Sequence, residues 1–171
     1  RQRQMCIRDR FISDRMASKQ VFFSTDVFGT IIGSYVDSMS VGQDYSLMAG
    51  CVDYMCPMIY PSHYGNGNFG IEYPDTEPYK TIEGALRASK KDLSLEMRDG
   101  EYQAVVRPWL QGFTASYLQH YISYGKEQIR AQIQAVYDSG YDEWLIWNAA
   151  NNYDFSAFLT KEEAERIETQ R

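Results

Sequence analysis

Polar and aromatic side chains accompany each of four apolar runs in this sequence, at or just after the point where the run ends. A carboxylate, Asp26, stands near the end of the first run, and an imidazole, His63, follows the second. Carboxylates and imidazoles transfer protons, whereas aromatic and amide groups pack against and hydrogen-bond to sugar rings. The candidate ligand-binding residues are Tyr60, His63, Tyr64, Arg107, Trp109, Gln111, Trp147 and Asn148. The pattern predicts a carbohydrate ligand, with Asp26 as acid, base or nucleophile.

Each candidate also has a structural interpretation that the sequence leaves open. Asp26 is equally consistent with a residue that anchors a loop or pairs with an arginine. His63 is equally consistent with a residue that makes only a structural hydrogen bond. Trp109 and Trp147 suit the core of a barrel as well as a sugar platform. Arg107 shares strand parity with Trp109, so an inward orientation requires a negatively charged partner.

The composition limits the classes of partner. The chain has 171 residues, enough for one domain with a core, and its 14 Tyr, 8 Phe and 3 Trp exceed what a small core needs. A net charge of -6 argues against nucleic acid and against an anionic membrane surface. No run reaches the roughly 18 apolar residues of a membrane span. We therefore expect a carbohydrate partner, no nucleic acid and no membrane contact in this chain.

The cysteines and histidines predict neither a metal site nor a cofactor. Cys51 and Cys56 lie in or beside an apolar run, and no second pair of ligands accompanies them. We expect them to be buried free thiols rather than a disulfide or metal ligands.

Alternating periods predict the secondary structure. Short β-branched and aromatic runs predict strands at residues 21–29, 51–60, 104–110 and 143–148. Apolar residues at helical spacing predict helices after Pro78 and over residues 129–137, the second closed by Gly140. Thr160 and Glu163 form a capping box for a last helix.

The strands read as apolar on both faces and alternate with helices, which predicts parallel βα units and an α/β fold. A (β/α)8 barrel takes about 250 residues, and residues 11–20 form a helical pattern that ought to follow an earlier strand. We interpret residues 11–171 as the C-terminal half of a TIM barrel and residues 1–10 as a non-native or disordered segment. The alternative is a small doubly wound sheet, but STDVFG is not the Gly-rich phosphate loop typical of that fold.

Four ordered segments carry a resemblance to a known family. STDVFG, GQDYSLMAGCVDYMCPMIYPSHY, VVRPWLQGF and EQIRAQIQAVYDSGYDEWLIWNAANNY resemble the glycoside hydrolase domain family of bacterial envelope proteins, over roughly residues 11–158. The resemblance implies a TIM barrel in which the four predicted strands are the fifth to the eighth. It also implies hydrolysis of a bacterial cell-wall or exopolysaccharide glycan, and a location outside the cytoplasm or in the cell envelope.

The same resemblance implies two departures from the family. The fourth strand, which ends in a carboxylate in relatives, is absent from this chain, so we expect the chain alone to be inactive. That carboxylate is also the expected partner of Arg107. Gly112 stands where relatives often have an acidic residue. A non-catalytic barrel that only binds glycans therefore stays open as the alternative function.

Overall fold

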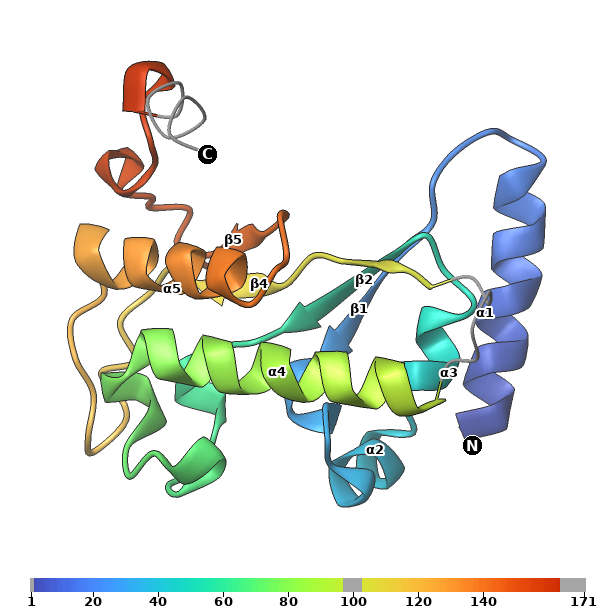
Figure 1. Ribbon diagram of the computed structural model, residues 1–171, viewed down its shortest axis with the longest axis horizontal. Coiled ribbons are helices and arrows are strands. Elements are labelled where there is room, and N and C mark those ends of the chain that lie inside the picture. The colour runs from blue at the N-terminus through green and yellow to red at the C-terminus, as the bar shows by residue number, and fades with distance from the viewer. Residues whose placement is uncertain (1, 97–102, 164–171) are drawn as a thin grey trace.

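A parallel β-sheet lies at the centre of the computed structural model, which describes residues 2–96 and 103–163 (Figure 1). The strands are β1 (Ser24–Phe28), β2 (Tyr54–Met58), β3 (Val105–Val106), β4 (Trp109–Gln111) and β5 (Leu145–Trp147). The order across the sheet is β1-β2-β4-β5, β3 also pairs with β2, and every pairing is parallel. Each strand overlaps one of the four predicted runs, which confirms a mixed α/β fold with a parallel sheet. The third run forms two short strands around Pro108, which has no N–H group to donate.

Helices precede and follow the strands along the chain. The α-helices are α1 (Gln2–Ala17), α2 (Tyr35–Val41), α3 (Tyr45–Ala49), α4 (Pro78–Glu96) and α5 (Lys126–Asp138). The short 3-10 helices are η1 (Gly29–Ile31), η2 (Pro61–His63), η3 (Asn68–Gly70), η4 (Pro74–Thr76) and η5 (Phe155–Ala157). The long helices α4 and α5 lie next to each other in front of the sheet in Figure 1. Both were predicted from their apolar stripes, and Gly140 follows α5 with a left-handed φ of 72°, as predicted for the residue after a helix cap.

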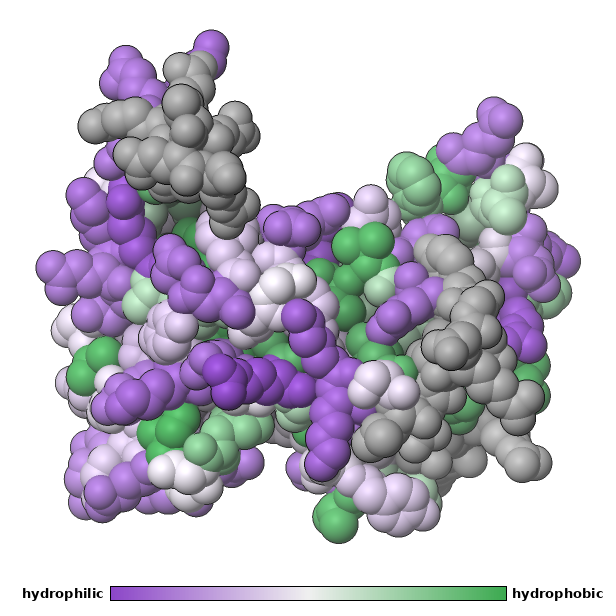
Figure 2. Space-filling model, in the orientation of Figure 1, coloured by the Kyte–Doolittle hydropathy of each residue, from purple (hydrophilic) through white to green (hydrophobic). Residues whose placement is uncertain are grey.

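The core fills the space between these two helices and one face of the sheet. Alternate strand residues such as Val27, Met55 and Leu110 are fully buried there, together with Leu86 of α4 and Val136 of α5. The outward surface of the helices is mostly hydrophilic, as the band of polar residues across Figure 2 shows. One face of the sheet is thus covered in the way expected of βα units.

The opposite face of the sheet is open over several large side chains. Phe22 is 78% exposed, Phe28 is 46% exposed, and Val105 and Trp147 are each 45% exposed. Because side chains alternate between the two faces of a strand, Asp26 also belongs to this open face. Apolar side chains on a sheet are normally covered by a second layer.

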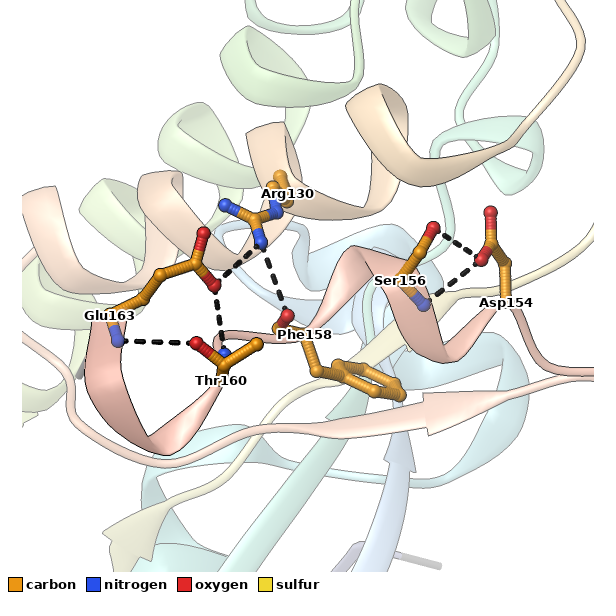
Figure 3. Close-up of polar contacts among 6 residues, drawn as sticks. All are labelled: Arg130, Asp154, Ser156, Phe158, Thr160 and Glu163. Carbon is orange, nitrogen blue, oxygen red and sulfur yellow. Dashed lines mark hydrogen bonds and ion pairs between the residues drawn. The ribbon is translucent and has the colours of Figure 1, made fainter.

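The segment after β5 is tied to α5 by a polar network (Figure 3). The predicted capping box is present, since the Thr160 N–H donates to Glu163 Oε2 at 2.8 Å and the Glu163 N–H donates to Thr160 Oγ1 at 3.2 Å. Arg130 of α5 donates to the Phe158 carbonyl at 3.1 Å and lies 3.4 Å from Glu163 Oε2. Most of the predicted last helix lies outside the described residues.

Helix α1 includes the segment at residues 2–10, which the sequence predicts to be non-native or disordered. Asp9 on this helix is buried, with only 4% of its surface exposed. The origin of the segment stays a prediction. Among the described residues, no helix combines the length and apolar character needed to cross a bilayer.

Candidate functional site

Asp26 and Trp109 meet on the open face of the sheet. Asp26 lies on β1 opposite Cys56 of β2, and Trp109 lies on β4 opposite Met58 of the same strand. The indole Nε1–H of Trp109 donates a hydrogen bond of 2.7 Å to Asp26 Oδ1. The bond therefore crosses β2 and orients the carboxylate while leaving its side chain exposed.

Trp147 extends this arrangement at the end of β5. Its ring stands edge-to-face against the ring of Trp109, with centroids 6.1 Å apart and planes at 90°. Nearly half of the Trp147 surface is exposed, so a flat apolar ring is available next to the carboxylate. Aromatic side chains of this kind bind one apolar face of a ligand and leave its polar edges to other groups.

Tyr60 and His63 come from the turn after β2. The Tyr60 ring packs edge-on against His63 at 5.0 Å and against Phe113 at 5.9 Å. Burial, then the charge of Asp26 and the neighbouring Tyr153, raise the pKa of Tyr60, so its hydroxyl stays protonated and can donate. Partial burial of the imidazole lowers the pKa of His63, and this favours the neutral form of the side chain. We call Asp26, Tyr60, Trp109 and Trp147 the rim cluster.

Cys56 lies opposite Asp26 on the neighbouring strand and has an unreactive thiol. Burial, and secondly the charge of Asp26, raise its pKa to about 11. Its thiol is therefore protonated at neutral pH and is a poor nucleophile. Cys51 and Cys56 are both buried and free, as predicted.

Gln111 is placed differently from the sequence prediction of a ligand-facing amide. It is fully buried; its Oε1 accepts from the Ser62 N–H at 3.0 Å and its Nε2 donates to Asp75 Oδ1 at 2.9 Å. Its backbone N–H and C=O groups both bond the side-chain amide of Gln132 on α5, each at 2.9 Å. With both amide atoms used inside the protein, Gln111 positions the loop that carries Tyr60.

Tyr64 and Asn148 also lie outside the rim cluster. Tyr64 belongs to the core, packs against Phe69 with ring centroids 5.1 Å apart, and is 8% exposed. Asn148 organises the loop after β5, because its Nδ2 donates to the carbonyls of Gly112 at 2.6 Å and Asn152 at 2.8 Å. Tyr64 therefore contributes to packing, and Asn148 holds a loop in place.

Arg107 has a different partner from the one expected. The sequence points to a carboxylate on a missing strand, but the guanidinium forms an ion pair with Glu143 and stacks over the Tyr54 ring at 4.0 Å. The register explains this pairing. Trp109 lies opposite Leu145 in adjacent parallel strands. Arg107 and Glu143 each come two residues earlier, so they meet on the same face. The expectation of an external partner is therefore corrected.

Gly112 sits where the family resemblance implies an acidic residue, and its surroundings explain the glycine. A Cβ atom at this position would lie 2.6 Å from Ile146 Cγ2 and 3.0 Å from the Trp147 carbonyl. Because its backbone also pairs with Trp147 at 2.9 Å, the chain has no room to move away. An acidic side chain at this position would require Ile146 or the Trp147 backbone to move.

Two polar features of the site escaped the sequence analysis. Tyr153, in the loop after β5, contributes to the raised pKa of Tyr60, and the sequence analysis assigned it no role. Asp75 is buried and bonded to Gln111, yet in the sequence it resembles an ordinary turn residue between prolines. Within the described ranges, no group of three or more His, Cys, Asp or Glu side chains is arranged to hold a metal ion.

The fold and the site together define an α/β protein with a parallel sheet and a carboxylate held among aromatic rings on its open face. The model of a family described as "Putative glycosyl hydrolase domain" matches residues 8–153. The chain belongs to that family, and the family resemblance noted in the sequence is confirmed.

Two solved structures show the same fold at low sequence identity. The spore cortex-lytic enzyme SleL of Bacillus cereus is 11% identical, with a TM-score of 0.60 over 91% of this chain and 44% of the other. The glycoside hydrolase domain of PgaB (BpsB) from Bordetella bronchiseptica is 12% identical, with a TM-score of 0.53 over 97% of this chain and 43% of the other. The chain thus spans less than half the length of either structure. A comparison with curated protein sequences gives no match.

Proposed function

We propose that this chain carries part of the active site of a glycosidase that hydrolyses O-glycosyl bonds in a bacterial cell-wall or exopolysaccharide glycan. The observation that carries the proposal is the Asp26 carboxylate, held at 2.7 Å by the Trp109 indole beside the exposed ring of Trp147. A carboxylate in this setting serves as acid, base or nucleophile at a glycosidic bond. The family and the folds of SleL and PgaB support this class of reaction.

The remaining groups have assigned roles in this proposal. Trp147 stacks on a sugar ring, and the Tyr60 hydroxyl and the neutral His63 imidazole hydrogen-bond to sugar hydroxyl groups. A glycan of this kind is reached outside the cytoplasm or in the cell envelope, which is where we place the protein.

We also propose that the sheet is the C-terminal half of a (β/α)8 barrel, with the four strand positions of the sheet as the fifth to eighth. The open sheet face supports this, because Phe28 and Trp147 are exposed where a closed barrel has its interior. The length of the chain, under half that of the two similar structures, supports it as well. Active sites of such barrels lie at the carboxyl ends of the strands. In the rim cluster, Trp147 is the last residue of β5 and Tyr60 comes just after β2.

A non-catalytic glycan-binding barrel is the second candidate. The rim cluster contains one carboxylate, Asp26, whereas glycosidases generally use two, about 5 to 10 Å apart. In the catalytic proposal the second carboxylate is on the fourth strand of the complete barrel. In the binding proposal it is absent, and the aromatic residues alone explain the site.

The test compares Asp26→Asn with the parent sequence in turnover assays on cell-wall glycan strands and on poly-N-acetylglucosamine. The assays use this chain and a longer polypeptide that contains it. We expect turnover by the longer polypeptide to fall by about 10²-fold to 10⁴-fold, with glycan affinity nearly unchanged. Asp142→Asn, an exposed carboxylate on the α5–β5 loop, is the matched control. Full turnover by Asp26→Asn rejects the catalytic assignment, and binding without turnover by the parent favours the second candidate.

A further inference from the structure

A cavity outside the rim cluster takes no part in the roles assigned above. It has a volume of about 210 Å³ and lies between the loop after β2 and the loop after β4. Its lining includes Asn66, Tyr73, Asp75, Leu118, Gln119 and His120. One water molecule occupies about 30 Å³ and drug-sized ligands fill about 300 Å³ or more, so the cavity suits one small ring.

Asp75 is the buried polar group of this cavity. Only 2% of its surface is exposed, and its Oδ1 accepts a hydrogen bond from Gln111. Its other oxygen, Oδ2, is buried and makes no hydrogen bond within the described residues. Burial raises the pKa of Asp75, so the carboxyl group has a greater tendency to carry a proton than an ordinary aspartate. A buried oxygen of this kind costs stability until a partner bonds to it.

The loop backbone around Asp75 is firmly fixed. The Tyr124 hydroxyl donates to the Asp75 carbonyl at 3.0 Å, and the Thr81 hydroxyl donates to the Pro74 carbonyl at 2.9 Å. Tyr124 follows β4, whereas Thr81 lies on α4, so two separate elements hold the turn. The Asp75 backbone is therefore held in one position in the wall of the cavity.

Aromatic rings form one side of the same cavity. Tyr73 and His120 come from different loops and stack with centroids 3.9 Å apart and planes 28° apart. His120 is exposed, and Asn66 and Gln119 add amide groups nearby. A flat ring surface with amide and carboxyl groups suits a neutral polyhydroxylated ring, and a carboxyl group is unfavourable for an anion such as phosphate.

The cavity is joined to the rim cluster through Gln111. This side chain bonds Asp75 on one side and the backbone of Ser62 on the other, and Ser62 lies between Tyr60 and His63. The turn with Tyr60 and His63 and the two loops that line the cavity all follow the carboxyl ends of strands β2 and β4.

We propose that this cavity is a second sugar-binding subsite, which holds another unit of the glycan bound at the rim cluster. Asp75 hydrogen-bonds one of its hydroxyl groups, and the Tyr73–His120 pair packs against its ring. The inference rests on the proposed function and adds a requirement for length, since only an oligosaccharide long enough to reach both sites uses the cavity.

The experiment measures binding of β-1,4-linked and β-1,6-linked N-acetylglucosamine oligomers, from dimer to hexamer, to the full chain by titration calorimetry. We expect His120→Ala to weaken binding of hexamer about tenfold and to leave binding of dimer unchanged. Tyr117→Ala, a 69% exposed tyrosine on the same loop, is the control and should bind every oligomer like the parent. In parallel, the imidazole NMR signals of His120 should shift with hexamer and stay in place with dimer.

The outcomes separate this subsite from the proposed function. If Trp147→Ala weakens binding at every length while His120→Ala changes none and its signals stay in place, the rim cluster binds glycan and the subsite is rejected. If the parent binds no oligomer, both proposals fail. A length-dependent loss in His120→Ala, with the matching NMR shifts, supports the subsite.

Discussion

The Trp109 indole reaches across strand β2 to bond the Asp26 carboxylate at 2.7 Å. Neighbouring strands lie about 4.8 Å apart, so the two backbones are separated by about twice that distance. A short donor such as serine would not cover this gap from β4, whereas the large indole does. The bond therefore links β1 to β4 on the open face and fixes the orientation of the carboxylate that we assign to chemistry.

The energetic link between these two residues is measurable in a double-mutant cycle. Trp109→Phe keeps an aromatic ring beside Trp147 but removes the N–H donor, and Asp26→Ala removes the acceptor. We expect a coupling free energy of about 1 kcal/mol in urea unfolding, because the bond involves a charged group but is open to solvent. Simple additivity of the two single changes would show that the hydrogen bond contributes nothing to stability.

The open sheet face predicts self-association of the isolated chain. Phe22 and Phe28 are exposed on it, and β1 is an edge strand of the sheet. Sedimentation velocity should show oligomers that decrease when both phenylalanines are changed to serine. Tyr117→Ser, at a tyrosine that is 69% exposed but lies on a loop, should leave the oligomers in place. A sharp monomer at high concentration would contradict the proposed half barrel.

The Arg107–Glu143 ion pair should contribute little to stability. The two side chains are 30% and 40% exposed, so water screens their attraction. We expect Glu143→Gln to lower the free energy of unfolding by less than about 1 kcal/mol, and the difference to shrink as salt is added. A loss of about 3 kcal/mol or more, insensitive to salt, would indicate a buried pair whose partner is left uncompensated.

Asp75 should make stability depend on pH. Burial raises its folded pKa above the value of about 3.9 expected in the unfolded chain. Between these two values the folded state binds more protons than the unfolded state, so stability falls as the pH rises through that window. Asp75→Asn keeps an acceptor for Gln111 but cannot ionise. Its melting temperature relative to the parent should therefore be higher at pH 7 than at pH 3.5.

The control for this measurement is Asp142→Asn, which changes an exposed carboxylate. Its melting temperature relative to the parent should differ little between the two pH values. The same flat result for Asp75→Asn would show that the Asp75 carboxyl group titrates normally despite its burial.

The sequence by itself determined the parallel α/β character and the family. Strand runs such as residues 51–60 alternate with helical stripes, and this local periodicity reflects which side chains each element must bury. The Thr160–Glu163 capping box and the glycine after α5 were also predicted, because helix ends are set by residues within one or two turns. Parity along β1 likewise placed Asp26 on the face away from Val27.

Only the tertiary structure decided how these residues meet. The register of β4 against β5 brings Glu143 to Arg107, and the order β1-β2-β4 brings Trp109 to Asp26; neither is encoded within a single element. Gln111 has the parity of a ligand-facing residue, yet loops distant in the sequence enclose it and take up its amide hydrogen bonds. Local patterns fix the direction of a side chain, whereas burial and hydrogen-bond partners depend on segments that become neighbours only when the chain folds.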